Sequence, residues 1–314
     1  MKNTIFSSSL GYLFEGFIRQ KQNEGFSYEE QISRLKNFDK YCLKKNITAD
    51  SITKENLRDY LTIKETESKN SFYARFCLIR QFLIYMNARG IHVSIPNISI
   101  SKSKPVPFLM TDEQVEAFIS SVDKNPPKRN FNYSVFFRLL CTTGLRVNEA
   151  LKLRINDYDE INKSLTVIHA KGNKDRIIYL ADDMNQLLRT YLNSRKRRSP
   201  FIFYGNDINK PHTYGVVSKT FRKRWMQTKF YTNTGKNPTV HSLRHYFVIK
   251  RINLWASEGI SINSMILYLS KHLGHASPNE TYYYYHLIKD SLKIMSTKDV
   301  TGKKIMEGIK YEEE

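Results

Sequence analysis

The sequence predicts a mainly α-helical protein with a small antiparallel β-sheet. Apolar residues recur at helical spacing through most of the 314 residues, and capping motifs precede several of these segments. Residues 163–169 and 175–180 instead alternate between apolar and polar side chains in the manner of strands, and a glycine-containing turn separates them. The helical periodicity sets the fold class, and this hairpin supplies the sheet.

Four helices are expected in residues 1–90. The first carries an apolar stripe at helical spacing, and the capping box Ser27-Tyr-Glu-Glu30 is expected to open the second. Thr53 is suited to cap a short third helix, and Gly90 is suited to end the fourth. These elements predict one helical N-terminal domain.

A second domain is expected after an interruption of the helical pattern. Residues 91–107 contain three prolines and four serines, which predicts a linker, although an ordinary surface loop fits the same composition. The capping box Thr111-Asp-Glu-Gln114 then begins a domain over residues 108–290. Its helices are expected at about 132–143, 182–197, 215–229, 239–253 and 262–272. Residues 291–314 predict a polar tail.

The net charge of +20 favours a polyanionic partner, because lysine and arginine displace condensed counterions from nucleic acid. The excess is spread along the chain, with +7 in residues 1–104 and +13 in residues 105–314. Both domains are therefore expected to contact double-stranded DNA. A lysine-rich bias of an AT-rich genome is the alternative source of this charge.

Few cysteines and no long apolar run characterise the chain. Cys42, Cys77 and Cys141 form no CxxC pair, so they predict neither a disulfide framework nor a zinc site, which fits a reducing compartment. Runs of about 18 apolar residues are absent, so no membrane span is expected. The expected location is the cytoplasm, at the nucleoid.

Two arginines, a lysine, two histidines and a tyrosine carry the chemistry of the second domain. They are Arg146, Lys171, His241, Arg244, His275 and Tyr284. Guanidiniums hold phosphate oxygens in bidentate fashion, lysine and histidine move protons, and tyrosine can hold a phosphate covalently. The set suits attack on a phosphodiester without a metal ion or other cofactor. Taken alone, Arg146 also fits an ordinary helix-end salt bridge with Glu149.

At these residues the chain resembles the tyrosine recombinase/integrase family. The shared pattern is an arginine, a lysine in a β-turn, His-x-x-Arg, Leu-Gly-His and a tyrosine about one helix later. The resemblance implies a four-helix, SAM-like core-binding domain over residues 1–90 and a tyrosine recombinase catalytic domain over 108–290. It also implies that four protomers cleave and rejoin two DNA sites through a 3′-phosphotyrosyl intermediate, with the tail docking on a neighbouring protomer.

The resemblance also assigns roles. Arg146 and Arg244 stabilise the charge that spreads over the non-bridging oxygens in the transition state. Lys171, before the glycine of the turn, protonates the leaving 5′ oxygen, and Tyr284 is the nucleophile. A lysine at a hairpin tip is more often simply solvated, and Lys174 is the rival for this role.

The histidines divide into catalytic and structural candidates. His241 and Arg244 lie three residues apart, hence on one helix face. The resemblance lets His241 bind a non-bridging oxygen or accept the tyrosine proton, and it makes His245 a structural partner. His275 is expected to begin a helix with its ring toward the phosphate, whereas His272 precedes the Leu-Gly pair and is less suited.

Four consecutive tyrosines, residues 282–285, surround the expected nucleophile. The family tyrosine follows the Leu-Gly-His histidine by nine residues and precedes another histidine by two, and Tyr284 meets both conditions. Tyr283 and Tyr285 are expected to point elsewhere, because successive helical residues rotate by about 100°. An ordinary phenol has a pKa near 10, so Tyr284 needs a base or a positive field.

Basic residues beside these motifs are expected to contact the DNA backbone, with a solvated surface as the alternative. They lie in the linker, beside the hairpin turn and in one basic cluster. They are Lys102, Lys104, Lys174, Arg176, Arg222, Lys223 and Arg224.

The expected activity is site-specific DNA recombination, in an integrase or transposase of a mobile element, with a chromosome-dimer resolvase as the other role that fits a simple recombinase. The alternatives are DNA relaxation of the type IB topoisomerase kind and a DNA-binding protein without catalysis. The target site and the need for an accessory DNA-bending or excision protein are left open by the sequence.

Overall fold

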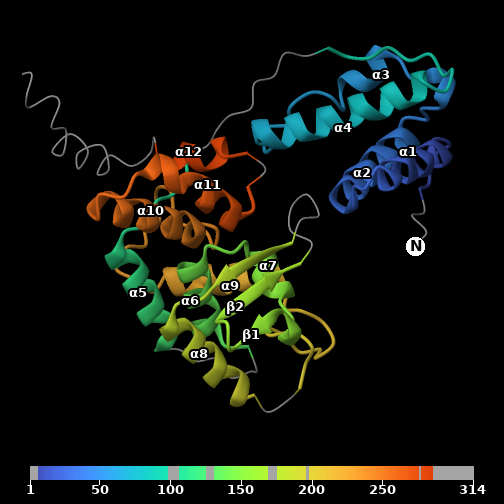
Figure 1. The fold of residues 1–314 in the computed structure, drawn as a ribbon. Helices are drawn as coiled ribbons and strands as arrows, with labels where there is room; N and C mark the ends of the chain where they lie inside the picture. The colour runs from blue at the N-terminus through green and yellow to red at the C-terminus, as the bar shows by residue number, and fades with distance from the viewer. Residues whose placement is uncertain are drawn as a thin grey trace, which may run out of the picture. The chain divides into compact units, whose positions relative to one another are not determined.

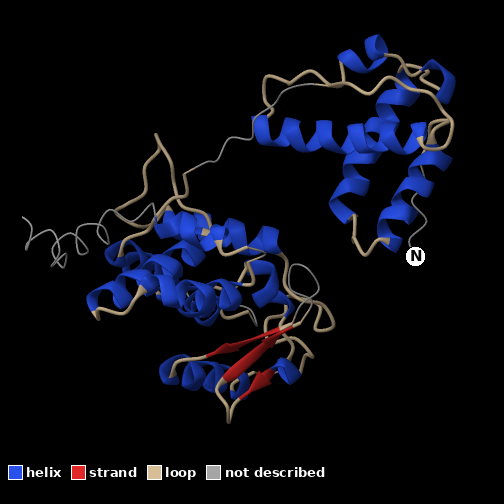
Figure 2. Ribbon diagram, turned by 45° about the horizontal axis from the view of Figure 1, so that its top comes forward, coloured by secondary structure: helices blue, strands red, loops and turns tan. Residues whose placement is uncertain are grey.

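The structure, a computed structural model, is mainly helical with one small sheet in its described part, which confirms the predicted fold class (Figures 1 and 2). The described residues are 6–97, 106–124, 131–168, 175–195, 198–275 and 277–285. The chain divides into two compact units, Met1–Pro105 and Val106–Glu314, and this division falls within the expected linker. None of the described helices has both the length and the apolar composition needed to cross a bilayer.

The N-terminal unit consists of helices that pack around an aromatic core. Helix α4 packs against α1 and α2. Phe14 stacks on Phe82 with ring centroids 4.5 Å apart, and Phe38 meets Phe14 edge-on at 5.9 Å. The helices are α1 Gly11–Asn23, α2 Glu29–Lys44, α3 Lys54–Arg58 and α4 Lys69–Asn87, with a 3₁₀ turn at Ala49–Ser51. The SAM-like class of this unit stays a prediction.

Two of the three predicted helix boundaries in this unit are confirmed. The Thr53 hydroxyl accepts the Asn56 N–H at 3.2 Å and caps α3. Gly90 takes a φ of +79° after α4, its N–H donates to the Asn87 carbonyl, and the Ile91 N–H donates to the Met86 carbonyl. These two bonds form a Schellman motif, which requires the left-handed conformation that glycine adopts without strain.

The predicted capping box at Ser27 is wrong. Helix α2 follows Tyr28, which takes the left-handed conformation, and no side chain caps its first turn. Tertiary packing explains the difference, because the Tyr28 ring meets Phe17 edge-on and its hydroxyl donates to Gln81. Ser27 therefore lies one residue too early to cap the helix.

The C-terminal unit surrounds helix α6, which packs against α5, α8 and α10. The capping box at Thr111 is confirmed by reciprocal bonds between Thr111 and Gln114 at 3.0 and 3.3 Å. The helices of the unit are α5 Asp112–Asp123, α6 Tyr133–Thr143, α7 Val147–Lys152, α8 Asp182–Asn193, α9 Tyr214–Trp225, α10 Ser242–Ser257, α11 Ile262–Leu273 and α12 Asn279–Tyr285, with a 3₁₀ turn at Ile155–Asp157.

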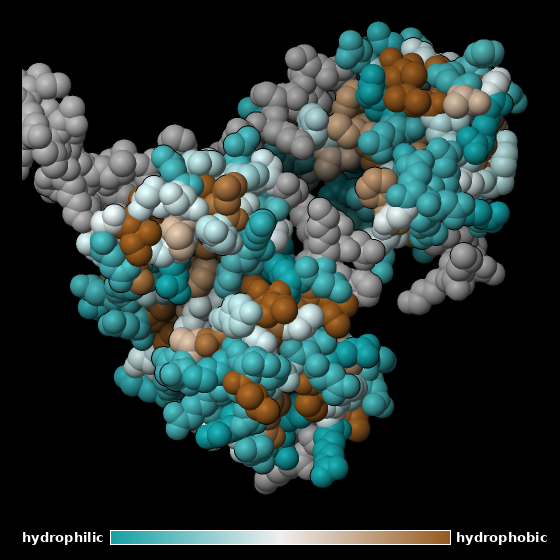
Figure 3. All heavy atoms as spheres, viewed as in Figure 1, coloured by the Kyte–Doolittle hydropathy of each residue, from teal (hydrophilic) through white to brown (hydrophobic). Residues whose placement is uncertain are grey.

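The sheet contains the predicted hairpin. Strand β2 (Ser164–Val167) pairs antiparallel with β1 (Tyr158–Asp159) and with β3 (Arg176–Tyr179). Leu165 faces Ile178 across β2 and β3, and both side chains are fully buried. The opposite face of β3 carries Ile177 and Tyr179, and both side chains are exposed. The surface seen in Figure 3 is otherwise largely hydrophilic.

Helix α10 connects two apolar clusters of this unit. Leu243 in its first turn belongs to the large cluster around α6, whereas Phe247 and Val248 belong to a smaller cluster with α11 and α12. Tyr284 is a member of that smaller cluster. In Figure 1, α10, α11 and α12 accordingly lie together at one end of the unit. This end carries most of the expected catalytic residues.

Candidate active site

Arg146 lies at the turn between α6 and α7. Gly144 ends α6 with a φ of +64°, and a Cβ there would collide with the ring of Phe247, so only glycine fits. The Arg146 Nη1 donates to Glu149 Oε1 at 2.9 Å and to the Leu273 carbonyl at 3.2 Å. Its Nη2 donates to the Gly274 carbonyl at 3.0 Å. The ordinary salt bridge with Glu149 is thus real, but it is one part of a larger network.

Arg244 approaches the same helix end from α10. Its side chain is almost fully buried, at 3% exposure. Nη1 donates to the Gly144 carbonyl and Nη2 to the Leu273 carbonyl, both at 2.7 Å. Burial, followed by the charge of Arg146, lowers the pKa of Arg244 to about 10, so it stays protonated at neutral pH. Arg146 and Arg244 share one carbonyl and therefore converge on one place.

Tyr284 lies on α12 beside these arginines of its own chain. Its side chain is 6% exposed, and its hydroxyl lies 2.7 Å from Nδ1 of His245. Burial raises the pKa of the Tyr284 phenol, and the charges of Arg244 and Arg146 oppose this rise. The phenol is therefore protonated at neutral pH and lies within the field of both guanidiniums.

His245 is the residue whose contact the sequence reasoning missed. Burial, followed by His241 and Arg244, lowers its pKa to about 4, so the ring is neutral and Nδ1 can accept the phenolic proton of Tyr284. The available signal was the spacing, because His241 and His245 lie four residues apart on one helix face. Their rings meet edge-on with centroids 4.7 Å apart.

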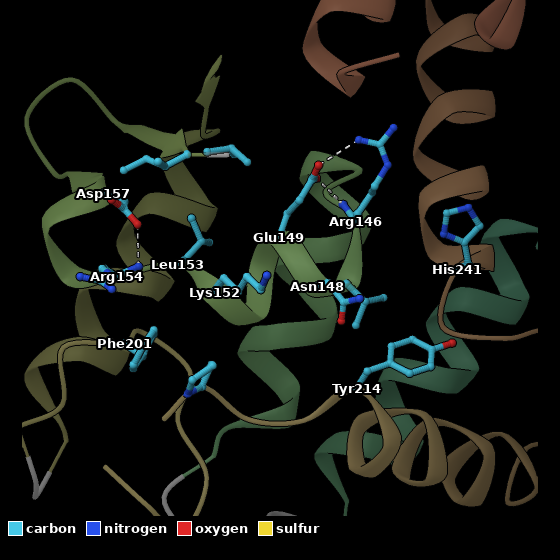
Figure 4. A pocket seen from close by; sticks show the side chains of 14 residues that line it. Arg146, Asn148, Glu149, Lys152, Leu153, Arg154, Asp157, Phe201, Tyr214 and His241 are labelled. Carbon is cyan, nitrogen blue, oxygen red and sulfur yellow. Dashed lines mark hydrogen bonds and ion pairs between the residues drawn. The ribbon is translucent and has the colours of Figure 1, made fainter. Parts of the chain in front are cut away.

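His241 lines an open pocket of about 1000 Å³ together with Arg146. Figure 4 shows these two side chains at one end of the pocket, with Arg154 and Asp157 at the other. Burial, followed by the charges of Arg244 and Arg146, lowers the pKa of His241. A neutral imidazole beside a guanidinium can donate to a phosphate oxygen or accept a proton.

The expectation that His275 begins a helix is wrong. Gly274 ends α11 with a φ of +62°, and α12 begins only at Asn279. The His275 ring instead makes a 2.7 Å hydrogen bond through Nδ1 with the hydroxyl of Thr281, across the turn that joins the two helices. The Nε2 of His272 hydrogen-bonds the Thr143 carbonyl at 2.8 Å.

Several expected residues lie outside the described part of the chain. Lys171 and Lys174 belong to residues 169–174, and Lys102 and Lys104 belong to residues 98–105. The expected tail also lies outside it. Their predicted roles stay predictions.

The remaining basic residues are placed by the structure. Arg222 and Lys223 are exposed on the last turn of α9, and Arg224 beside them donates to Gln227. Arg176 is placed otherwise: its guanidinium forms an ion pair with Glu149 and is only 10% exposed. No cluster of metal-binding side chains occurs among the residues that the structure describes.

Acid should weaken the fold through His245. A pKa of about 4 in the folded protein, against 6.5 ordinarily, means that the unfolded chain binds more protons between these values. The stability contributed by neutral His245 is therefore complete above pH 6.5 and is lost as the pH falls toward 4. Urea unfolding at pH 7 and at pH 5 measures this loss. Between these pH values, the free energy of unfolding of His245→Gln should fall by about 2 kcal/mol less than that of the unsubstituted protein. An equal loss in both would contradict a buried neutral His245.

Comparison with known proteins identifies the family of this chain. Residues 109–290 match the sequence profile of the phage integrase family. The chain belongs to this family of tyrosine recombinases. The prediction of a tyrosine recombinase is thereby confirmed, and with it an enzyme that cleaves and rejoins DNA in site-specific recombination.

Relatives of this recombinase span most of its length. It is 24% identical over 293 residues to the putative integrase/recombinase y4rE of Sinorhizobium fredii, covering 90% of this chain and 93% of that protein. It is 30% identical over 218 residues to the tyrosine recombinase XerA of Pyrococcus furiosus, covering 69% and 70%.

Solved structures share the fold of the recombinase. The Tn1549 transposon integrase in complex with a circular intermediate DNA matches with a TM-score of 0.66 at 16% identity, covering 93% of this chain and all of that chain. A lambda integrase tetramer bound to a Holliday junction matches with a TM-score of 0.64 at 17% identity, covering 87% and 79%.

Proposed function

We propose that this tyrosine recombinase uses Tyr284 as its nucleophile and acts in cis, on a phosphate held by Arg146 and Arg244 of the same chain. The observation that carries this proposal is the position of the phenol, 2.7 Å from His245 and within the field of both guanidiniums. No other protomer is needed to bring the tyrosine to the arginines.

The donors left over on the two arginines fit a phosphate. Arg146 uses two Nη1 protons and one Nη2 proton, and Arg244 uses one proton of each Nη. Among the bonds of the described residues, Arg146 therefore keeps Nε–H and one Nη2–H, two donors that can bind phosphate oxygens. Arg244 keeps its Nε–H and one proton on each Nη.

The proposed step exchanges one oxygen for another on phosphorus. The Tyr284 oxygen forms a bond to the phosphorus, the bond to the 5′ oxygen breaks, and the phenolic proton leaves to a neighbouring base. Lys171 donates a proton to the leaving 5′ oxygen. The ring of His275 interacts with the phosphate. A 5′-hydroxyl of another strand reverses the step, so the phosphodiester is restored without ATP or a metal ion.

We infer that four protomers exchange strands between two duplexes and that the enzyme belongs to a mobile element acting on cytoplasmic DNA. The likeness to the lambda integrase tetramer and to the Tn1549 integrase supports this, as does the TnP I resolvase of Bacillus thuringiensis, which is 27% identical over 231 residues. The test is a plasmid that carries two element ends in direct repeat. Excision of the intervening segment supports the proposal, and relaxation of supercoils alone supports the topoisomerase alternative.

DNA affinity should fall steeply with salt, because a net charge of +20 implies release of many counterions. Each contacted phosphate contributes about −0.9 to the slope of log K against log salt. The double variant Arg222→Gln/Lys223→Gln should make this slope shallower by about 2, because both side chains are exposed on α9. Fluorescence anisotropy over a salt series measures it. A flat response of the unsubstituted protein would contradict binding through the DNA backbone.

A further inference from the structure

Three guanidiniums bind the carboxyl end of α11. Arg176 donates from Nε to the His272 carbonyl at 2.7 Å, and Arg146 and Arg244 share the Leu273 carbonyl. The last carbonyls of a helix have no partner within it, and they form the negative end of its dipole. The helix end therefore offsets the repulsion between three neighbouring cations, of which Arg176 has no part in the proposed chemistry.

Arg176 reaches Arg146 through a single carboxylate. It donates to Glu149 Oε2 at 2.7 Å and to Oε1 at 3.2 Å, so the pair is bidentate. Glu149 then accepts the Arg146 backbone N–H through Oε2 and its Nη1 through Oε1, both at 2.9 Å. Glu149 and Arg176 are 11% and 10% exposed, so water competes little for these bonds. The direction of the Arg146 guanidinium thus depends on Glu149, and that of Glu149 depends on Arg176.

A glycine makes room for this arrangement. A Cβ on Gly274 would lie 2.8 Å from Nη1 of Arg176 and 3.1 Å from its Cζ, so a larger residue would displace the guanidinium. Arg176 lies on β3 and Gly274 follows α11, and these elements pack together although they are far apart in sequence. The guanidinium lies against the backbone turn that leads from α11 toward α12 and Tyr284.

We propose that Arg176 is a positioning residue rather than a DNA contact. It fixes Glu149 and the end of α11 so that Arg146 presents its remaining donor pair to the scissile phosphate. The proposal rests on the role proposed above for Arg146. It replaces the DNA-backbone contact expected from the sequence, because three of the five donors of Arg176 already bind within the protein.

The first test separates binding from cleavage in the full-length protein. Arg176→Gln should lower single-turnover cleavage of a nicked duplex by about 100-fold, since small misplacement of a catalytic group has a cost of this order. DNA affinity and its salt slope should not change. Arg176→Lys should remain impaired, because an ammonium keeps the charge but cannot reproduce the bidentate pair. A salt slope reduced by about 1 in Arg176→Gln would overturn the proposal in favour of a phosphate contact.

The second test asks whether Arg176 acts through Arg146. A neutral methylphosphonate at the scissile position has less negative charge than a phosphodiester. A guanidinium that stabilises negative charge therefore contributes less to the cleavage of such a duplex. Arg146→Ala should therefore lose less activity on this duplex than on the phosphodiester duplex. Arg176→Gln should likewise lose less activity on the methylphosphonate duplex than on the phosphodiester duplex. Equal defects of Arg176→Gln on both duplexes would show a merely structural role and would overturn the proposal.

Arg75 supplies a matched control. It forms a bidentate pair with Glu67 in the N-terminal unit, at comparable exposures of 10% and 14%. Arg75→Gln should lower the melting temperature, yet cleave both duplexes normally below it. If Arg146→Ala itself cleaves the phosphodiester normally, the proposed function of Arg146 fails. If Arg146→Ala is inactive and Arg176→Gln is normal, only the present inference fails.

Discussion

Tyr284→Phe is expected to abolish the covalent protein–DNA adduct on a nicked suicide duplex while leaving DNA affinity unchanged. The substitution removes the one oxygen that can form the phosphotyrosyl bond and keeps the ring that packs among α10 and α11. Removing the nucleophile of a covalent enzyme lowers the rate by about 10⁶-fold, which places the adduct below detection. Denaturing electrophoresis with labelled DNA measures the adduct, and anisotropy measures the affinity.

Tyr283→Phe is the matched control, since it removes a neighbouring hydroxyl from the same helix. The two rings meet edge-on with centroids 6.2 Å apart, and the Tyr283 side chain is partly buried. We expect this variant to form the adduct normally. An undiminished adduct in Tyr284→Phe, or its loss in Tyr283→Phe alone, would reject Tyr284 as the nucleophile.

Arg244→Ala is expected to lower cleavage by about 10²–10³-fold, the cost of one lost transition-state donor. It should also lower the free energy of unfolding by about 1–3 kcal/mol, because the buried carbonyls of Gly144 and Leu273 each lose a donor. Single-turnover cleavage and urea unfolding measure the two effects. DNA affinity should change far less than the rate, since the lost interaction is strongest in the transition state.

Arg244→Lys separates charge from geometry. A lysine keeps a positive charge but cannot hold both carbonyls and still present two parallel donors to a phosphate. We expect its cleavage rate to lie between those of the alanine variant and the unsubstituted protein. Equal losses of affinity and of cleavage rate in Arg244→Ala would make Arg244 a docking residue instead.

Local signals in the sequence predicted much of the fold. The period of the apolar residues identified the helices, and the alternation on either side of the turn identified the hairpin of β2 and β3. The caps at Thr53 and Thr111 depend on bonds within three residues, so they could be recognised without the fold. The cap expected at Ser27 failed because the packing of Tyr28 outweighed a bond of this local kind.

The candidate site also combines residues that the sequence identified with contacts that only the structure shows. Residue types, order and spacing carry the resemblance to the tyrosine recombinases, and this resemblance singled out Arg146, Arg244 and Tyr284. Only the folded chain decided that Tyr284 meets His245, and that Arg176 binds Glu149 instead of facing solvent. The first of these contacts joins residues that are 39 positions apart in the sequence, and the second joins residues that are 27 positions apart. Such pairings are fixed by how α10, α11, α12 and β3 pack, and a linear pattern does not record which distant groups share a buried space.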